Sequence, residues 1–247
     1  MTENRTPPAL KITRTRTVRE LARRLEKMAA ARRPGGRFTA AATGIPALDA
    51  LLPDGGFRSG TLVEWLADSA ASAVGFLALL SARALLRNDR ALVVLDRDQT
   101  FYPPAAAAWG IALTQMIVVR PKNPAEELWA LEQCLQSAGV AVSLCRLERA
   151  TNRALRRLQL AAERGGALGF LLRPLSARGQ PAWSDVRLLV TSLVPLSSRR
   201  RWCVEFVRCR RGAGEKSVIL ELDDATGVVS PVAELAPAAR VSQAARA

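Results

Sequence analysis

The stretch TGIPALDALLPDGGFRSGTLVEWLADSAASAV, residues 43–74, decides the fold of this 247-residue chain. Its second half carries the apolar run Thr61–Trp65, which follows three glycines and predicts a strand. Ala70–Leu86 comes next and predicts a helix. A strand that runs almost directly into a helix is the first half of a strand–helix–strand unit. The same alternation continues for the next hundred residues.

Further strands and helices follow in turn after this first pair. Asn123 and Pro124 supply an N-cap and a first-turn proline for one of the helices, which we expect to run to Gln136. The other expected strands are Ala91–Leu95, Met116–Val119, Val140–Leu144 and Ala167–Leu172, and the other expected helices are Pro104–Trp109 and Asn152–Glu163. Strands separated by helices of this size favour right-handed crossovers, so we predict an α/β fold with a mostly parallel sheet.

The pattern changes after Arg173. Pro174–Trp183 is a polar loop with glycine and proline, and Val186–Val194 is again apolar. Apolar residues then alternate with polar ones on both sides of a glycine turn, which predicts an antiparallel C-terminal hairpin. We therefore divide the chain into a basic arm and helix (1–37), a core with the appended hairpin (38–224) and a flexible tail (225–247).

The N-terminal region carries an amphipathic helix. Thr17 and Glu20 have the spacing of a capping box, and an apolar stripe follows at helical spacing. The stripe comprises Val18, Leu21, Leu25 and Met28. Residues 32–36, which contain proline and glycine, end the helix. The stripe either packs on the protein's own core or mediates contact with a partner or a second copy.

Histidine is absent from the sequence, which excludes His-based triads, His general bases and His-ligated zinc. The four cysteines (Cys134, Cys145, Cys203 and Cys209) are widely spaced, so we expect reduced residues and no metal site. Apolar runs such as Val74–Leu80 are too short to cross a bilayer, and no secretory signal is recognisable. These features predict a cytoplasmic protein without a membrane partner.

The formal net charge of +14 is concentrated in two regions. Residues 1–37 hold 11 Lys and Arg against 3 acidic residues, and residues 146–216 hold 16 against 5. Solvated arginine on an ordinary surface is one interpretation. The concentration of the positive charge in two regions favours a second interpretation. In this interpretation the protein binds a polyanionic partner through phosphate contacts and counterion release.

The opening stretch resembles the entry to a RecA-type ATPase core. In that core a TG-x-x-x-LD helix, matched here by Thr43–Asp49, leads through a glycine turn into the first strand. The resemblance implies a RecA-like sheet flanked by helices. It also implies that a phosphate-binding loop should follow the strand that contains Glu64.

The loop that follows lacks the residues that bind nucleotide in such ATPases. An active loop reads G-x-x-x-x-G-K-[ST], in which backbone N–H groups and lysine hold phosphates and the hydroxyl holds magnesium. Here Ala67 and Ser72 stand at the glycine positions, Ala73 at the lysine and Val74 at the hydroxyl. Asp68 would repel phosphate. We therefore expect no nucleotide cofactor.

Two later positions complete this comparison. Asp98 stands where the family carries its catalytic carboxylate, although a plain loop residue is the simpler interpretation. Cys145 stands where the magnesium-orienting aspartate belongs. Phosphoryl transfer needs a metal ion and a lysine to neutralise the developing charge. The resemblance therefore implies a RecA-type fold that is not an enzyme, a pseudo-ATPase.

LRRLQLAAE (residues 155–163), GGALGFLLRP (residues 165–174) and RRRW (residues 199–202) resemble the ImuA family. Members of this family are RecA-like accessory proteins of bacterial SOS mutagenesis cassettes, which act in DNA repair and damage tolerance. The resemblance implies a role in translesion synthesis beside polymerase-like partners. It also implies an N-terminal helix that can support self-association.

Candidate DNA-binding residues lie in the loop at Pro174–Trp183 and on the hairpin, because RecA-type proteins insert a loop at this position into single-stranded DNA. Arginine beside an aromatic ring that can stack on bases suits sequence-independent binding of single strands. We therefore expect the protein to associate with the nucleoid when it acts. The candidates are Arg173, Arg178, Trp183, Arg187, Arg199, Arg200 and Arg201. Alternatively, Trp183 is a core anchor and the arginines face an acidic protein.

Two other functions remain open at this stage. One is a protein-interaction module such as a SulA-type inhibitor of cell division, which is also a degenerate RecA relative. The other is a divergent RecA-type ATPase with a rearranged nucleotide site, against which the substitutions at residues 67–74 count heavily.

Overall fold

The computed structural model describes residues 40–67, 72–86, 90–196, 199–209, 216–223 and 227–232. The predicted N-terminal arm and helix, with the stripe Val18, Leu21, Leu25 and Met28, lie outside the described residues. Residues 233–247 of the predicted tail lie outside them as well.

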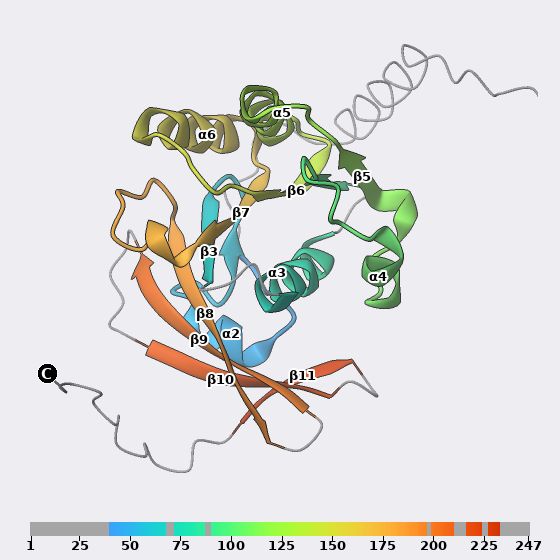
Figure 1. The fold of residues 1–247 in the computed structure, drawn as a ribbon, viewed down its shortest axis with the longest axis vertical. Helices are drawn as coiled ribbons and strands as arrows, with labels where there is room; N and C mark the ends of the chain where they lie inside the picture. Colours follow the sequence, from blue (N-terminus) through green and yellow to red (C-terminus); the bar gives the residue numbers. More distant parts are fainter. Residues whose placement is uncertain are drawn as a thin grey trace, which may run out of the picture.

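From β3 to β8 the described elements alternate strands and helices, and only strands follow (Figure 1). The strands are β1 (Ala40–Ala41), β2 (Phe57–Arg58), β3 (Leu62–Ala67), β4 (Ala91–Leu95), β5 (Met116–Val119), β6 (Val140–Arg146), β7 (Leu168–Pro174), β8 (Val186–Leu196), β9 (Arg199–Cys209), β10 (Lys216–Asp223) and β11 (Val228–Pro231). The α-helices are α2 (Pro46–Leu51), α3 (Ser72–Leu85), α4 (Pro103–Ala108), α5 (Pro124–Gln136) and α6 (Asn152–Gly165), and η1 (Leu113–Gln115) and η2 (Leu175–Ala177) are 3₁₀ turns.

One nine-stranded sheet organises the described chain, in the order β11-β10-β9-β8-β3-β7-β6-β4-β5. The six strands from β8 to β5 in this order run parallel to their neighbours. From β8 outward the pairings with β9, β10 and β11 are antiparallel. The predicted fold class is confirmed, because the protein is α/β with a large, mostly parallel sheet, flanking helices and C-terminal antiparallel strands.

The helices cover the two faces of the sheet. Helices α5 and α6 lie together on one face, and α3 lies on the other, where the antiparallel strands curve beneath it (Figure 1). Apolar residues on the α3 face form the larger core, in which the rings of Phe57, Trp65 and Phe170 meet edge to face at centroid distances of 5.3–5.8 Å. The separate core beneath α5 and α6 includes Leu131 and Leu158. Both faces are buried, which explains the continuous apolar runs of the central strands.

Local capping determines where α5 and α6 begin and end. The Asn123 side chain accepts a hydrogen bond from the Glu126 N–H, as an N-cap residue does, and Pro124 is the first helical residue. Thr151 caps α6 in the same way, through Ala154 N–H. Gly166 ends α6 in the left-handed conformation at φ 72°, where glycine has no steric penalty. The cap and first-turn proline predicted for α5 are confirmed.

The C-terminal strands differ from the prediction in one respect. The hairpin of β9 and β10 forms as expected, but Val228–Pro231 continues the sheet as β11, paired with β10. Residues 228–231 of the predicted tail therefore form a strand, and the flexibility of the rest of the tail stays a prediction. Val228 and Val229 favour a strand, but the segment has only four residues, follows Gly227 and ends at Pro231.

Among the described residues, no helix combines the length and the apolar character that crossing a membrane requires.

Two helical glycines are expected to respond oppositely to alanine. A Cβ on Gly165 would lie 2.1 Å from the Leu135 carbonyl oxygen, where α6 approaches α5, whereas a Cβ on Gly75 would meet nothing within 4 Å. Gly165→Ala should lower the free energy of unfolding by about 1–3 kcal/mol through overpacking. Gly75→Ala should raise it by about 0.5–1 kcal/mol, because alanine loses less backbone entropy in a helix. Urea unfolding of both variants measures the difference, and equal shifts would contradict the close contact of α5 and α6.

Candidate functional site

A pocket of about 800 Å³ opens at the carboxyl ends of β3, β4, β6 and β7. Ligand sites of open α/β sheets lie at this edge, where the loops after parallel strands converge. The lining side chains among the described residues are apolar, neutral polar or charged. They belong to Ala67, Val74, Gly75, Leu79, Val94, Leu95, Asp96, Thr100, Phe101, Leu144, Arg146, Glu148, Arg149, Leu172, Arg173, Pro174, Ser176 and Gln180.

The part of the pocket next to α3 is apolar. Ala67, at the end of β3, and Val74, in the first turn of α3, both line it, and Val74 is buried. Residues 68–71 and the side chains of Ser72 and Ala73 lie outside the described part. The described ends of the predicted phosphate loop therefore offer methyl groups to the pocket, and its inability to hold phosphate stays a prediction.

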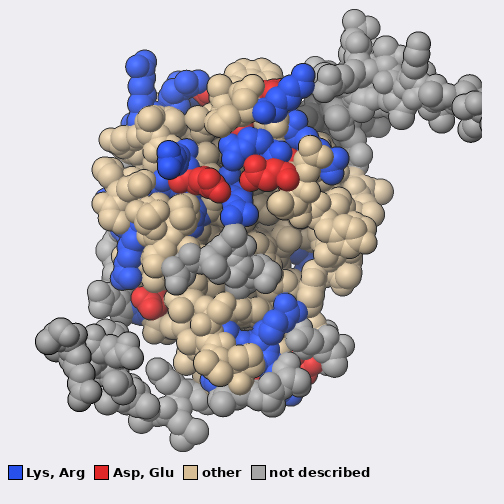
Figure 2. Space-filling view, in the orientation of Figure 1, with Lys and Arg blue, Asp and Glu red and all other residues tan. Residues whose placement is uncertain are grey.

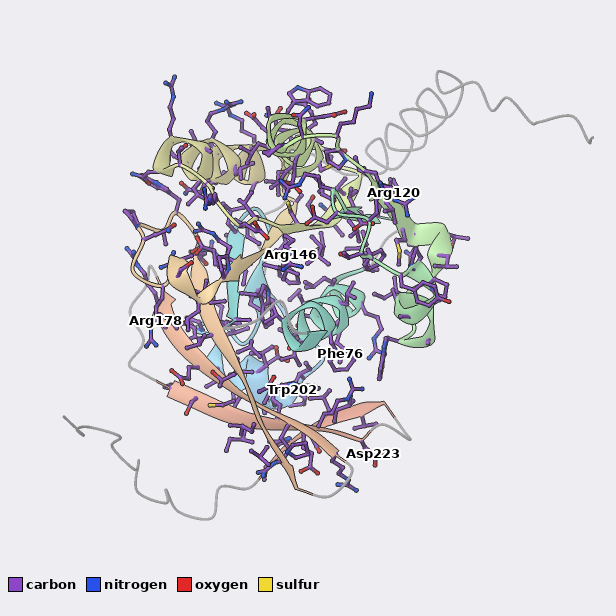
Figure 3. All side chains as sticks on the ribbon, viewed as in Figure 1. Phe76, Arg120, Arg146, Arg178, Trp202 and Asp223 are labelled. Atoms are coloured by element: carbon purple, nitrogen blue, oxygen red, sulfur yellow. The ribbon has the colours of Figure 1, made fainter. Side chains whose placement is uncertain are left out.

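The end of β6 places Cys145, the position predicted for a lost metal ligand, away from the pocket. Cys145 is fully buried in the core beneath α5 and α6, on the face of the sheet away from the pocket. Burial raises the pKa of the Cys145 thiol well above its ordinary range, so it stays protonated. Side chains alternate along a strand, so the next residue, Arg146, lines the pocket instead. The strand therefore presents a cation, not a metal ligand, at this edge (Figure 3).

Two aspartates follow β4 and have different surroundings. Asp96 is buried, and its Oδ1 accepts hydrogen bonds from the N–H groups of Thr100 and Phe101 at 2.8 and 3.1 Å. Asp98 lies in the exposed turn and pairs with its neighbour Arg97 at 3.3 Å. Asp98 thus has the surroundings of a loop residue. No group of three or more Cys, Asp and Glu residues in the described segments is arranged to hold a metal ion.

A buried cluster of three charges lies behind the pocket. Glu64 of β3 is between the two neighbouring strands, and its Oε2 lies 2.6 Å from Nη2 of Arg187 on β8 and 3.5 Å from Nη1 of Arg173 on β7. Oε2 also accepts a 2.9 Å hydrogen bond from Arg187 Nε. All three side chains are at most 2% exposed. Burial lowers the pKa of Arg173 from its ordinary value, an effect that Glu64 opposes and the nearby Arg187 reinforces.

The same cluster holds the loop after β7 against the core. Arg187 Nη1 donates to the carbonyl oxygens of Arg178 and Gln180 at 2.8 and 3.1 Å. Arg173 Nη2 donates to Gln180 Oε1 at 2.9 Å. Arg173 and Arg187, which we predicted as DNA-binding residues, therefore have buried guanidinium groups that hold the loop. Their contact with DNA stays a prediction.

Trp183 anchors the other end of this loop. Its side chain is half-buried against the core beneath α5 and α6, and its Nε1 donates a hydrogen bond to Asn152 Oδ1. The guanidinium of Arg156 stacks on its ring at 4.6 Å from the centroid. The ring therefore joins the loop to the first turns of α6, and one face is already occupied by a cation.

Exposed arginines surround this junction. Arg149, Arg153 and Arg178 are exposed, and Arg156 is half-buried on Trp183. We call these four residues the arginine face. Figure 2 shows Lys and Arg side chains gathered over α6 and the neighbouring loops, with acidic side chains among them. Arg149 and Arg153 were not predicted as site residues. The sequence feature that could have indicated them is the series of arginines between the carboxyl end of β6 and the first turns of α6.

The predicted hairpin arginines lie apart from this face and have intramolecular partners. Arg199 Nη1 lies 2.9 Å from Glu221 Oε1, and this hydrogen bond raises the pKa of Arg199 above its ordinary value. Arg201 Nε lies 3.6 Å from Glu221 Oε2. Arg200 lies over the rings of Phe76 and Trp202, about 6 Å from each centroid.

The fold and the pocket together define an α/β protein with a mostly parallel sheet and an arginine-rich carboxyl edge. No protein-family model matches the chain. Protein ImuA from two strains of Caulobacter vibrioides is 30% identical over 190 residues, which cover 68% of this chain and 78% of each relative. The chain belongs to the ImuA family.

Removing the charge of Glu64 should strongly destabilise the protein. Glu64→Gln leaves two buried guanidinium groups without a counter-charge, which typically costs about 3–5 kcal/mol. The matched control is Glu132→Gln, which breaks the surface pair with Arg157 and should cost less than about 1 kcal/mol. Urea unfolding followed by circular dichroism compares the two. Equal, small shifts would contradict a structural role for the buried cluster.

Proposed function

We propose that this protein is a non-catalytic accessory factor of DNA damage-induced mutagenesis. It binds single-stranded DNA without regard to sequence and acts beside polymerase-like proteins of translesion synthesis, without hydrolysing ATP. Membership in the ImuA family supports the broad accessory role in damage-induced mutagenesis. The sequence motifs that resemble this family imply the same role.

The observation that carries the DNA-binding proposal is the availability of the arginine face. Among the described residues, Arg149, Arg153 and Arg178 have no carboxylate partner within ion-pair distance. A phosphate can therefore pair with them without displacing an existing contact. The hairpin residues Arg199 and Arg201 must first release Glu221, so we assign them a secondary role.

The proposed contact is mainly electrostatic. Guanidinium groups bind phosphate oxygens through charge-assisted hydrogen bonds and release condensed counterions from the nucleic acid. Trp183 supports the surface from beneath, since its ring packs on Arg156 and on the core. This arrangement favours backbone contacts over base stacking and therefore little sequence preference.

The absence of ATP hydrolysis is supported by the pocket walls. Ala67 and Val74 are apolar where an ATPase presents groups that bind phosphate and magnesium, and Arg146 points into the pocket from the end of β6. Contact with partners through Val18, Leu21, Leu25 and Met28 stays a prediction, because those residues lie outside the described part.

The salt dependence of DNA binding tests the arginine face. For single strands, each phosphate contact contributes about 0.7 to the slope of log K against log salt. Arg153→Gln and Arg178→Gln should each weaken binding to a fluorescent oligothymidine and lower the slope by about this amount. Arg157→Gln is the matched control, because Arg157 lies one turn further along α6 and already pairs with Glu132.

Three outcomes would contradict this proposal. Unchanged binding in both variants would place the DNA contact elsewhere, and no binding at low salt would leave an adaptor that binds only proteins. The titration is repeated with ATP and magnesium, and binding that depends on ATP would overturn the assignment as a non-ATPase.

A genetic experiment tests the accessory role. Deleting the gene should reduce damage-induced mutation frequency, and the wild-type gene should restore it. A gene carrying both Arg153→Glu and Arg178→Glu should restore it poorly, because like charges repel the DNA backbone. Overexpression that blocks cell division, with mutation frequency unaffected by deletion, would instead favour the SulA-type alternative.

A further inference from the structure

The pocket at the carboxyl edge opens beside the arginine face. Arg149 belongs to both, since it is exposed and also lines the pocket. The loop after β7 connects them a second time, because it contributes Arg178 to the face and contributes Ser176 and Gln180 to the pocket lining. A nucleic-acid strand whose phosphates pair with Arg149 and Arg178 therefore runs past the mouth of the pocket.

The wall inside the mouth is apolar. Side chains alternate along a strand, so Leu144 of β6 and Leu172 of β7 both face α3 and line the pocket. Arg173, the next residue after Leu172, faces the other side of the sheet and pairs with Glu64. Further apolar lining comes from Val74, Leu79, Val94 and Phe101. An occupant that fits this wall has a body without charge.

The buried carboxylate in the lining is already compensated by the protein. Asp96 Oδ1 accepts hydrogen bonds from two backbone N–H groups, and its Oδ2 lies 3.7 Å from Arg120 Nε. The other charged lining residues near the mouth lie at the end of β6, where Arg146 is half-buried and both Glu148 and Arg149 are exposed. Cationic groups are therefore available at the mouth of the pocket and not along its apolar wall.

The neutral polar residues of the lining also lie toward solvent. Thr100, Ser176 and Gln180 are exposed and carry hydroxyl or amide groups, which both donate and accept hydrogen bonds. A nucleobase has matching properties, because it is uncharged, its faces stack on aromatic side chains, and its edges carry donors and acceptors. The volume of about 800 Å³ admits a purine or a pyrimidine.

We propose that the pocket accepts one unstacked base of the single strand held by the arginine face, with its ring against Phe101 and the flanking phosphates on Arg146 and Arg149. This inference rests on the proposed binding of single-stranded DNA and adds the position of a base to it. Trp183 offers less room for a base, because Arg156 covers one face of its ring. In a duplex the base must first leave its stack and its partner, so the pocket favours single strands.

An oligomer without bases separates the base contact from the phosphate contacts. Oligothymidine and an abasic oligomer of the same length carry the same backbone charge. Both are labelled with a fluorophore and titrated with the full chain at several salt concentrations, and fluorescence anisotropy measures binding. We expect oligothymidine to bind about tenfold more tightly, as one stacked base allows, with the same slope of log K against log salt for both oligomers.

Filling the pocket locates the contact. Gly75 of α3 lines the pocket, and a Cβ there meets nothing within 4 Å, so Gly75→Leu places a side chain in the space. This variant should bind oligothymidine about tenfold more weakly and bind the abasic oligomer as the wild type does. Ala105→Leu is the matched control and should change neither affinity, because Ala105 is exposed on α4 and is not a lining residue. Thermal unfolding verifies that each variant is folded.

The outcomes separate this inference from the proposed function. Equal binding of the two oligomers, or oligothymidine binding that Gly75→Leu leaves unchanged, would overturn the base pocket while DNA binding stands. Failure of both oligomers to bind at low salt would overturn the proposed DNA binding and the base pocket together. Displacement of oligothymidine by ATP with magnesium at comparable concentration would identify a free nucleotide as the occupant and overturn the assignment to the bound strand.

Discussion

The contact between Glu64 and two arginines is the constraint on which the carboxyl edge of this protein depends. β3 lies between β7 and β8 in the sheet, and Glu64 faces an arginine on each neighbour. A buried carboxylate is tolerated only when it is paired, and so are the guanidinium groups. The three residues therefore have to be buried together. Their remaining N–H groups bind Gln180 and the Arg178 carbonyl, so the loop after β7 is held in place by the same interaction.

The arginines of this edge act in three different ways, and burial decides which. Arg187 and Arg173 are internal and hold the loop after β7 against the core. Arg156 covers the ring of Trp183 at the junction of the loop and α6. Arg149, Arg153 and Arg178 are exposed around that junction, where a phosphate backbone can reach them. Arginine suits all three situations because its planar fork binds oxygens and stacks on rings while staying charged.

The pocket differs from a nucleotide site in the residues at its strand ends. An ATPase combines a metal-binding carboxylate at the strand end with a phosphate cradle, whereas here β6 presents Arg146 and α3 presents Val74. In the function we propose, the sheet positions basic loops for DNA and partners, and chemistry at this edge is not required.

Local sequence determined the elements of this protein, and long-range contacts determined the roles of its charged residues. The strands β4 and β5 and the cap of α5 follow from periodicity and from Asn123, because such signals act within a few residues. By contrast, the burial of Arg187 depends on Glu64, which lies 123 positions away in the chain. The choice between Cys145 and Arg146 at the pocket depends on the register of one strand against its neighbours, and β11 exists because β10 offers it an edge. The sequence alone thus predicted a basic α/β protein of this family. Only the tertiary structure separated the arginines that hold the core from those that face solvent. A buried charge is stable only beside its partner, and the fold brings that partner to it.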